Sequence, residues 1–488
     1  MQTGSYIGGQ WFHPDSGRLV RNVNPADPSD VIAEFPSATA ADVARAVETA
    51  KGAARAWRAT PGPERGRIIW RAAEIARSRA EEIAQTMTRE EGKIIREARG
   101  EVARGLAVLE YYAGAGFRIE GKTLPAEARD TFTYTIRRPL GVVGLITPWN
   151  FPWAIPCWKS APALVAGNAV VMKPAELTPA TAALLTEIYE EAGVPAGVFN
   201  LVVGPGSVVG NALVDHPDVR ALSFTGSNAV GATLYAQAAR RGAKVTCEMG
   251  GKNAVIVMAD ANLEKAATAI VSGAFGSTGQ RCTATSRVVA HRAIKDALLG
   301  QVGALAAAMK IGSGLDESTD LGPAVDAHQL ETDLTYIGTA REEGARLVQG
   351  GRRPDGLPGY FVEPTIFDNV DPHMRIFKEE VFGPVLAVSS ADTLEDALEF
   401  ANRVEFGLAA SIFTQDIDTA MRFMEDVEVG MVHINEATVG GEAQLPFGGS
   451  KGTGVGEREM SEEGLNFFTE LKTVFVNYGQ SGRPASMR

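Results

Sequence analysis

The sequence is poor in cysteine and histidine. Its 488 residues include three cysteines, Cys157, Cys247 and Cys282, which are too few for a disulfide framework and are typical of a reducing compartment. The six histidines are scattered and no C-x-x-C motif occurs, which argues against a zinc site or another metal centre. The first residues, MQTGSYIGGQW, lack the basic and then apolar order of a signal peptide, so we expect a cytoplasmic protein.

Basic charge is also scarce. The 47 lysines and arginines are outnumbered by 59 acidic residues, and the net charge of −12 disfavours nucleic acid or an anionic membrane as a partner. Residues 139–158 carry no charge and are long enough to span a bilayer. However, Pro148, Pro152 and Pro156 each remove a backbone donor, and the groups freed there would stay unsatisfied in lipid. We expect a buried strand followed by an irregular loop that lines a pocket.

Apolar residues are plentiful in comparison. At 45% of the chain they can fill sizeable cores, and the length predicts two or three domains. The N-terminal third is predicted to be helical. Thr39 is the expected N-cap of a first helix, and the apolar spacing indicates a second helix from Glu64 to about Arg89 and a third over residues 97–113.

Two later regions, residues 141–249 and 254–433, alternate short β-rich runs with helical ones. This alternation is typical of βαβ units with a parallel sheet. TFTYTIRRP at 131–139 and KTVFVNY at 472–478 predict further strands. An apolar strand such as 472–478 is an aggregation-prone edge unless another strand pairs with it.

Cys282, in STGQRCTATSR, is the best candidate for a nucleophile. Small residues around it allow close packing, and the neighbouring Arg281 is expected to favour the thiolate. Free cysteines are often inert core residues, and we give that interpretation to Cys157 and Cys247. The motif around Cys282 favours catalysis only modestly when it is taken alone.

Two other polar residues stand in unusual places. Glu248, in CEMGGKN, lies between an apolar strand and a Gly-Gly turn, where desolvation would raise its pKa toward that of a general base. A carboxylate that caps a turn or helix would fit the same motif equally well. Asn150, in TPWNFP, offers an amide as an oxyanion donor, although an ordinary Asx turn is the better interpretation of this motif alone.

Several motifs favour a nucleotide cofactor. Lys173, in VVMKPAE, ends a predicted parallel strand, which is where ligands bind in open α/β sheets, and Glu176 could accept bonds from ribose hydroxyls. GPGSVVG at 204–210 and FTGSNAVG at 224–231 each follow a strand and open a helix, so their backbone N–H groups could face a pyrophosphate. Neither is a G-x-G-x-x-G motif, and turns also need glycine.

Seven motifs occur together in one order: PWNFP, KPAE, FTGS, EMGGK, GQRCTA, EEVFGPV and PFGGSK. In this combination the chain resembles the NAD(P)-dependent aldehyde dehydrogenase superfamily over nearly its full length. The resemblance implies that Cys282 attacks the aldehyde, that Asn150 stabilises the oxyanion and that Glu248 activates the water that hydrolyses the thioester. It also implies a position for Lys159 near the catalytic pocket, with its role left open.

The resemblance further implies which residues bind the cofactor and the substrate. NAD, with NADP as an alternative, is expected to contact strand ends, turns and two later motifs: Ile146, Thr147, Trp149, Lys173, Glu176, Gly206, Gly210, Thr225, Gly226, Ser227, Met249, Gly250, Glu380 and Phe382. Of these, Lys173 and Glu176 would bind the adenosine ribose, and Glu380 and Phe382 the nicotinamide side. The aldehyde is expected to contact the residues that line a tunnel: Arg104, Phe151, Trp158, Arg281, Thr283 and Phe447.

The fold that the resemblance implies is α/β and aldehyde dehydrogenase-like. It has a Rossmann-type cofactor domain (residues 1–120 and 140–249), an α/β catalytic domain (250–465) and a β-strand oligomerisation arm (121–139 and 466–488). In the superfamily the arm joins a neighbouring subunit, so we expect a homodimer or homotetramer that binds a small aldehyde.

The substrate expected from the resemblance is a semialdehyde. GEVARGLAVLEYYAG and EAQLPFGGSKG are most similar to the 2,5-dioxovalerate (α-ketoglutarate semialdehyde) dehydrogenases. Succinate semialdehyde, lactaldehyde, betaine aldehyde and aromatic aldehydes stay open as alternatives, and so, less favoured, do a CoA-acylating or a non-catalytic protein. A distal carboxylate requires a cation, and Arg104 is our first choice, although it could instead pair with Glu97 or Glu101 or point to solvent.

Overall fold

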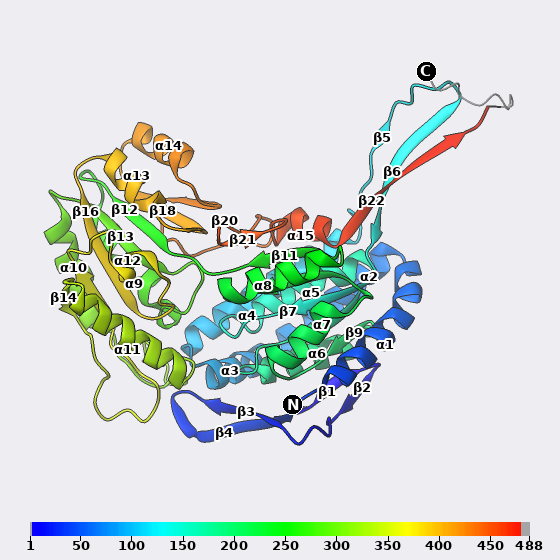
Figure 1. Cartoon of the computed structure of the whole chain (residues 1–488), viewed down its shortest axis with the longest axis horizontal. Coiled ribbons are helices and arrows are strands. Elements are labelled where there is room, and N and C mark those ends of the chain that lie inside the picture. The colour runs from blue at the N-terminus through cyan, green and yellow to red at the C-terminus, as the bar shows by residue number, and fades with distance from the viewer. Residues whose placement is uncertain (1, 480–488) are drawn as a thin grey trace.

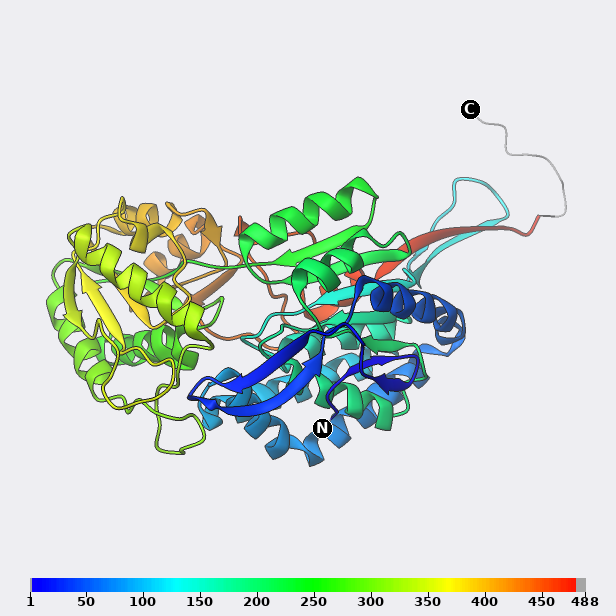
Figure 2. The same ribbon diagram turned by 60° about the horizontal axis from the view of Figure 1, so that its bottom comes forward.

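The structure is a computed structural model, and it describes residues 2–479. Two α/β bodies lie side by side, and a narrow arm of strands projects from one of them (Figures 1 and 2). Segments from both ends of the chain meet in the body that carries the arm. Among residues 2–479, no helix is long and apolar enough to cross a membrane.

The first body is built on a sheet whose central strands run parallel, as the alternating pattern predicts. Its strands, in spatial order, are β2 (Gln10–Phe12), β1 (Ser5–Ile7), β9 (Phe199–Leu201), β8 (Ala169–Lys173), β7 (Val142–Ile146), β10 (Val219–Thr225), β11 (Lys244–Glu248) and β21 (Gly454–Val455). The last strand comes from a much later part of the chain and pairs antiparallel with β11, which places Gly454 opposite Glu248.

Helices cover this sheet on both sides (Figure 1). They are α1 (Ala40–Ala59), α2 (Gly62–Ser78), α3 (Ala80–Glu91), α4 (Ile95–Ala115), α5 (Ala154–Ala166), α6 (Pro179–Glu191), α7 (Asn211–Asp215), α8 (Asn228–Arg240) and α15 (Ser461–Phe467). A π-helical turn at Gly206–Gly210 leads into α7. The outer hairpin is formed by β3 (Leu19–Asn24) and β4 (Asp27–Pro36).

The second body contains another sheet, parallel except at one edge. In order its strands are β14 (Arg346–Gln349), β15 (Thr365–Asp368), β16 (Val385–Ala391), β13 (Thr285–His291), β12 (Asn253–Val257), β18 (Ala409–Phe413) and β19 (Met431–Ile434). The helices packed around it are α9 (Leu263–Phe275), α10 (Lys295–Ala307), α11 (Ala327–Glu342), α12 (Arg375–Lys378), α13 (Leu394–Asn402) and α14 (Ile417–Asp426). A short ladder joins β17 (Phe406–Gly407) to β20 (Ser450–Lys451).

The arm pairs two strands that lie far apart in the sequence. β22 (Thr469–Asn477) runs antiparallel to β6 (Thr131–Pro139), and β5 (Thr123–Leu124) lies on the other side of β6. Both predicted strands are therefore present. No strand within residues 2–479 pairs with the outer edge of β22, and Phe475 on this strand is 72% exposed.

One helix start agrees with its prediction from the sequence, and one predicted helix does not. Thr39 caps α1 as predicted, because its hydroxyl accepts from the Asp42 N–H while the Asp42 carboxylate accepts from the Thr39 N–H. The single helix predicted over residues 64–89 is wrong. The backbone leaves helical geometry at Arg79, and the run divides into α2 and α3.

The proline-rich segment also differs from its prediction. A buried strand and a loop follow one another as expected, but the loop ends at Trp153 and α5 starts at Ala154. Cys157, placed in the loop by the sequence, is therefore buried in this helix. Pro156 is tolerated there because the first turn of a helix needs no intrahelical N–H donor.

Candidate active site

Cys282 lies in the turn between α9 and β13, where the backbone is tightly constrained. Ser277 and Thr278 have positive φ angles of 48° and 56°, an arrangement that costs energy and is common at functional sites. A Cβ atom on the next residue, Gly279, would lie 2.2 Å from the carbonyl oxygen of Gly383, so only glycine fits. The turn holds Cys282 where it lines a cavity together with Trp149 and Asn150 of the first body.

Two cavities meet at Cys282. We name the larger, of about 340 Å³, the α4 cavity; it is lined by Lys93, Glu97, Gly100, Glu101, Arg104, Phe151, Ile155, Trp158, Ser277, Arg281, Cys282, Thr283, Val439, Gly440 and Phe447. The other, of about 230 Å³, is the β10 cavity. It is lined by Pro148, Trp149, Asn150, Thr225, Gly226, Ser227, Met249, Gly250, Cys282, Gln329, Glu380 and Phe382.

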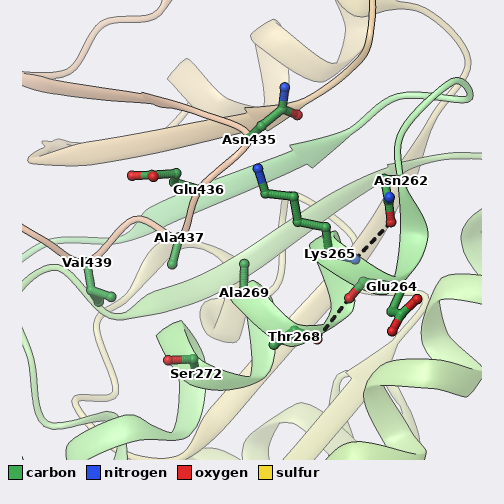
Figure 3. A pocket seen from close by; sticks show the side chains of 10 residues that line it. All are labelled: Asn262, Glu264, Lys265, Thr268, Ala269, Ser272, Asn435, Glu436, Ala437 and Val439. Carbon is green, nitrogen blue, oxygen red and sulfur yellow. Dashed lines mark hydrogen bonds between the residues drawn. The ribbon is translucent and has the colours of Figure 1, made fainter.

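A third cavity, of about 570 Å³, opens at the surface beyond Val439 (Figure 3). It lies between α9 and the segment 435–439, and the side chain of Lys265 extends from α9 toward Asn435. Val439 lines both this cavity and the α4 cavity. None of the residues predicted for the site lines the surface cavity, so the inner cavities are the better candidates for chemistry.

The structure brings all predicted substrate residues together and divides the predicted cofactor residues. Every member of the substrate set lines the α4 cavity: Arg104, Phe151, Trp158, Arg281, Thr283 and Phe447. The β10 cavity is lined by part of the cofactor set: Trp149, Thr225, Gly226, Ser227, Met249, Gly250, Glu380 and Phe382. The rest of that set is absent from its lining: Ile146, Thr147, Lys173, Glu176, Gly206 and Gly210.

Lys173 and Glu176 lie at the edge of the first sheet where ligands are expected. Lys173 ends β8, and its carbonyl accepts from the N–H of Thr147 after the neighbouring strand. Burial lowers the pKa of Lys173. Glu176 is partly exposed, 3.8 Å from the guanidinium of Arg18. Lys173 pairs with Ile146 at the end of β7, and the loop that follows β7 lines the β10 cavity.

Glu248 ends β11, and its carboxyl group is almost completely buried. Its exposed fraction is 3%, and its Oε2 atom has no hydrogen-bond partner among residues 2–479. Burial and the nearby Glu459 raise the pKa of Glu248 well above its ordinary value, in line with the sequence-based prediction. A Cβ on Gly448 would lie 2.3 Å from Glu248 Oε1, so a glycine is needed beside this carboxylate.

A buried polar network connects Glu459 to the wall of the α4 cavity. Its Oε1 accepts from Lys159 and, at 2.8 Å, from Ser223, and its Oε2 accepts from Trp158 Nε1 at 2.8 Å. Lys159 also donates to Ser223 at 2.7 Å. Sequence reasoning left the role of Lys159 open and did not find Glu459, because this network joins segments distant in sequence.

Asn150 lies in the loop between β7 and α5, and only 4% of it is exposed. Its side-chain Nδ2 donates to the carbonyl of Gln280 at 3.2 Å, two residues before Cys282. Its own carbonyl accepts from Lys93 Nζ at 2.7 Å. The amide and the thiol therefore share the β10 cavity.

The environment of the Cys282 thiol differs from the prediction made for it. Burial, aided by the carboxylates of Glu380 and Glu248, raises the pKa of Cys282 to about 12. Arg281 does not favour the thiolate, because its guanidinium binds Glu97 at 2.7 Å and Ser277 at 3.0 Å. Arg281 and Cys282 both line the α4 cavity, but the guanidinium is bonded to Glu97 and Ser277 and not to the thiol.

Arg104 is in a different electrostatic position from the other cations of the α4 cavity. It is half-buried, and its Nη1 donates to the carbonyl of Gly441. Glu97 binds Arg281 and Glu101 binds Lys93, so the two carboxylates that could have paired with Arg104 have other partners. Among residues 2–479, no carboxylate oxygen lies within 4 Å of its guanidinium.

The model of the aldehyde dehydrogenase family matches residues 11–474. The chain belongs to the aldehyde dehydrogenase family. The resemblance stated from the motifs is thereby confirmed.

Curated relatives of this aldehyde dehydrogenase cover nearly the whole chain. It is 49% identical to the α-ketoglutaric semialdehyde dehydrogenase of Bacillus subtilis, over 97% of each chain. It is 43% identical to the α-ketoglutarate semialdehyde dehydrogenase of Haloferax volcanii, over 97% of this chain and 99% of the relative.

Solved structures confirm the predicted fold class. An NAD-dependent aldehyde dehydrogenase from Sinorhizobium meliloti is 36% identical, with a TM-score of 0.96 over 99% of this chain and 96% of the other. A betaine aldehyde dehydrogenase from Staphylococcus aureus, in complex with NAD⁺, is 33% identical, with a TM-score of 0.96 over 100% of this chain and 97% of the other.

Some residues of this aldehyde dehydrogenase site were not predicted from the sequence. Lys93, Glu97 and Glu101 line the α4 cavity, and Gln329 lines the β10 cavity. Glu101 carried one usable signal, since a helix face that is otherwise apolar also carries Arg104 three residues later. Gln329 had no such signal in the sequence, because it reaches the site only through the packing of α11.

Proposed function

We propose that the protein oxidises a semialdehyde with a distal carboxylate, α-ketoglutarate semialdehyde (2,5-dioxovalerate), to the dicarboxylate with NAD⁺. The observation that supports this substrate is the partly buried Arg104, which lines the same cavity as Cys282 and has no carboxylate partner within 4 Å among the described residues. Relatives with 43–49% identity are named for this same reaction.

Covalent catalysis divides the oxidation into two steps. The Cys282 thiol gives up its proton to water, and Sγ adds as the thiolate to the aldehyde carbon, while the Asn150 amide and the Cys282 N–H donate to the oxyanion of the resulting thiohemiacetal. Water then attacks the thioester that is formed by oxidation. Glu248 takes the proton from this water, and the carboxylic acid leaves as the thiol is restored.

The β10 cavity has the features that a nicotinamide nucleotide needs. Gly226 and Gly250 line this cavity just beyond the ends of β10 and β11, where ligands bind in open α/β sheets, and the rings of Trp149 and Phe382 meet edge to face at 5.4 Å. Glu380, held by the N–H of Gly251 at 2.8 Å, offers a carboxylate for ribose hydroxyls. When bound there, NAD⁺ supplies the acceptor for the hydride.

A panel of aldehydes that differ in their distal group tests this function. NADH formation is measured with α-ketoglutarate semialdehyde, succinate semialdehyde, betaine aldehyde and pentanal. We expect kcat/KM for α-ketoglutarate semialdehyde to exceed that for pentanal by about tenfold or more, the effect of one charge-assisted hydrogen bond in a partly buried cavity. Preference for pentanal or for the cationic betaine aldehyde would contradict the proposed substrate.

A CoA-acylating reaction is the second candidate within the family. Glu248, which can activate water, favours hydrolysis over transfer to a thiol. The same assay with added CoA distinguishes them: we expect the free acid and no acyl-CoA by mass spectrometry.

We also propose that copies of the chain associate through the arm. Among the residues that the structure describes, β22 presents an unpaired edge with exposed Leu471 and Phe475, and β19 leaves an unpaired edge on the second sheet. Pairing between these edges would give the expected homodimer or homotetramer and would keep residues 121–139 and 466–479 as an arm beside the cofactor and catalytic domains. The rest of the predicted arm, residues 480–488, lies outside the described residues. Light scattering tests this proposal. The molar mass of Phe475→Asp in solution should be smaller than that of the wild type, because fewer copies of the chain associate.

A further inference from the structure

A buried glutamate of α4 holds the start of α5. Glu101 Oε1 accepts from the backbone N–H groups of Trp153 and Ala154, both at 3.0 Å. These N–H groups lie at the N-terminus of α5, where a helix has no intrahelical acceptors and where negative charge is favourable. Since α5 begins directly after the loop that contains Asn150, Glu101 fixes one end of that loop.

Lys93 connects this carboxylate to the loop itself. Only 1% of Lys93 is exposed, and its Nζ donates to Glu101 Oε2 at 2.6 Å and to the Asn150 carbonyl at 2.7 Å. Its Nζ also lies 4.4 Å from the ring centroid of Phe151. The ammonium group therefore contacts two consecutive residues of the loop and the carboxylate that holds its end.

The bond to the Asn150 carbonyl determines how the Asn150 side chain is aimed. Without Lys93, this carbonyl would be a buried acceptor without its donor, and the peptide would turn toward another group. A turn of the peptide moves the Asn150 amide away from the loop of Cys282, which it now contacts through Gln280. Catalytic hydrogen bonds tolerate little displacement, since about 1 Å can cost about 10²-fold in rate.

We propose that Lys93 is a positioning residue that fixes the oxyanion donor Asn150, with Glu101 holding Lys93 in place. This inference rests on the proposed function, in which Asn150 stabilises the thiohemiacetal oxyanion. It adds to that function a residue from a different segment, between α3 and α4.

Two variants and one matched control test the role of Lys93. Lys93→Met removes the ammonium but leaves Glu101 buried without its partner. The double variant Lys93→Met/Glu101→Gln also removes the charge of Glu101 and retains an amide oxygen for the N–H groups of α5. Glu91, whose carboxylate lies 3.8 Å from Lys93 Nζ, loses the same partner in both variants. Glu90→Gln is the control, because Glu90 is equally buried and holds the start of α6 through Ala180 and Thr181, away from Asn150.

We expect both Lys93 variants to lower kcat for aldehyde oxidation by about 10²-fold, with KM for the aldehyde changed by less than about threefold. Binding of NAD⁺, followed by fluorescence titration, and alkylation of Cys282 by iodoacetamide should stay as in the wild type. Glu90→Gln should keep kcat within about threefold. Equal losses in the control and the Lys93 variants would show general damage and overturn the proposal.

The decisive measurement repeats Lys93→Met in an Asn150→Ala background. If Lys93 acts through Asn150, the second substitution adds less than about threefold to the loss. A further loss of about 10²-fold would overturn the proposal, and so would wild-type kcat in Lys93→Met or a failure of both Lys93 variants to fold. The proposed function fails separately, if the wild type oxidises no aldehyde or if Asn150→Ala leaves kcat unchanged.

Discussion

The two cavities that meet at Cys282 have very different walls. The α4 cavity is lined by charged side chains from three segments: Lys93, Glu97, Glu101, Arg104 and Arg281. The lining of the β10 cavity includes one carboxylate, Glu380, and its other residues are uncharged, among them two aromatic rings and two glycines. Burial raises the pKa of Glu380 to about 7, so its charge depends on pH near neutrality.

The difference shows where selectivity for the aldehyde can arise. On the α4 side, ion pairs neutralise Lys93 and Arg281 and leave Arg104 for a ligand. On the β10 side, the lining carries no cation, and residues at the strand ends can bind a nucleotide without discriminating among aldehydes. Substitutions in one cavity should therefore affect one ligand, and substitutions at the boundary should affect the whole reaction.

Cys282 lines both cavities, and Cys282→Ala should have the largest effect on aldehyde oxidation. We expect NADH formation to fall by about 10⁴-fold or more, because no other group in the site can form the covalent intermediate. NAD⁺ binding, measured by fluorescence titration, should persist. Cys157→Ala and Cys247→Ala serve as controls, since both cysteines are buried away from the cavities. Near-normal turnover in Cys282→Ala would refute the mechanism.

Glu248→Gln should separate the two steps. Steady turnover should fall by about 10²–10⁴-fold, while a pre-steady-state burst of NADH remains, because the base acts only in hydrolysis of the thioester. Stopped-flow absorbance measures both phases. Loss of the burst in a correctly folded variant would contradict this role.

The pH profile supplies an independent check on Glu248. Burial and Glu459 raise its pKa, and a base works only when deprotonated. Wild-type kcat should therefore decline as pH falls through this raised pKa, well above the ordinary range of a glutamate. The decline should disappear in Glu248→Gln. An unchanged profile in the variant would assign the titration to another group.

Arg104→Met sharpens the comparison within the α4 cavity. A hydrogen bond to a charged group is worth about 1.5–3 kcal/mol, so kcat/KM for α-ketoglutarate semialdehyde should fall by about 10- to 100-fold. Turnover of pentanal should change little. Arg281→Met is the matched comparison: it leaves Glu97 without its cation and should harm both substrates equally. If Arg104→Met also harms both equally, Arg104 is structural.

Glu176→Gln should give the smallest effect, outside both cavities. A carboxylate near the adenosine ribose repels a 2′-phosphate, so the wild type should prefer NAD⁺ over NADP⁺. Glu176 is partly exposed and faces Arg18, which weakens the repulsion. The variant should gain about threefold to tenfold in kcat/KM with NADP⁺, in steady-state assays. Equal use of both cofactors by the wild type would contradict this assignment.

Local sequence signals predicted the elements that depend on local interactions. The cap of α1 at Thr39, the bounds of β6 and the parallel order around β7 all follow from short patterns. The break at Arg79 did not, because the apolar spacing continues from α2 into α3 across it. Cys157 was misplaced because prolines in a first helical turn look like loop residues.

The motifs placed the candidate site, but not the pairing of its charges. Sequence neighbours suggested that Arg281 serves Cys282, whereas the structure pairs Arg281 with Glu97 from a helix in the other body. Glu459 approaches Glu248 only because β21 returns to β11. Such partners are set by tertiary packing and leave no local pattern. The catalytic and cofactor roles stay predictions for the experiments above.

The pairing of β21 with β11 also has a consequence for the synthesis of the enzyme on the ribosome. Glu248 and Cys282 leave the ribosome long before Phe447, Gly454 and Glu459, which close the α4 cavity and the surroundings of the base. Chain synthesis adds about 5–20 residues per second, so the thiol of Cys282 stays in an incomplete nascent chain for many seconds. During synthesis it is exposed to oxidants and electrophiles that the finished pocket excludes, so chaperones that shield this interval would protect the enzyme before its first turnover.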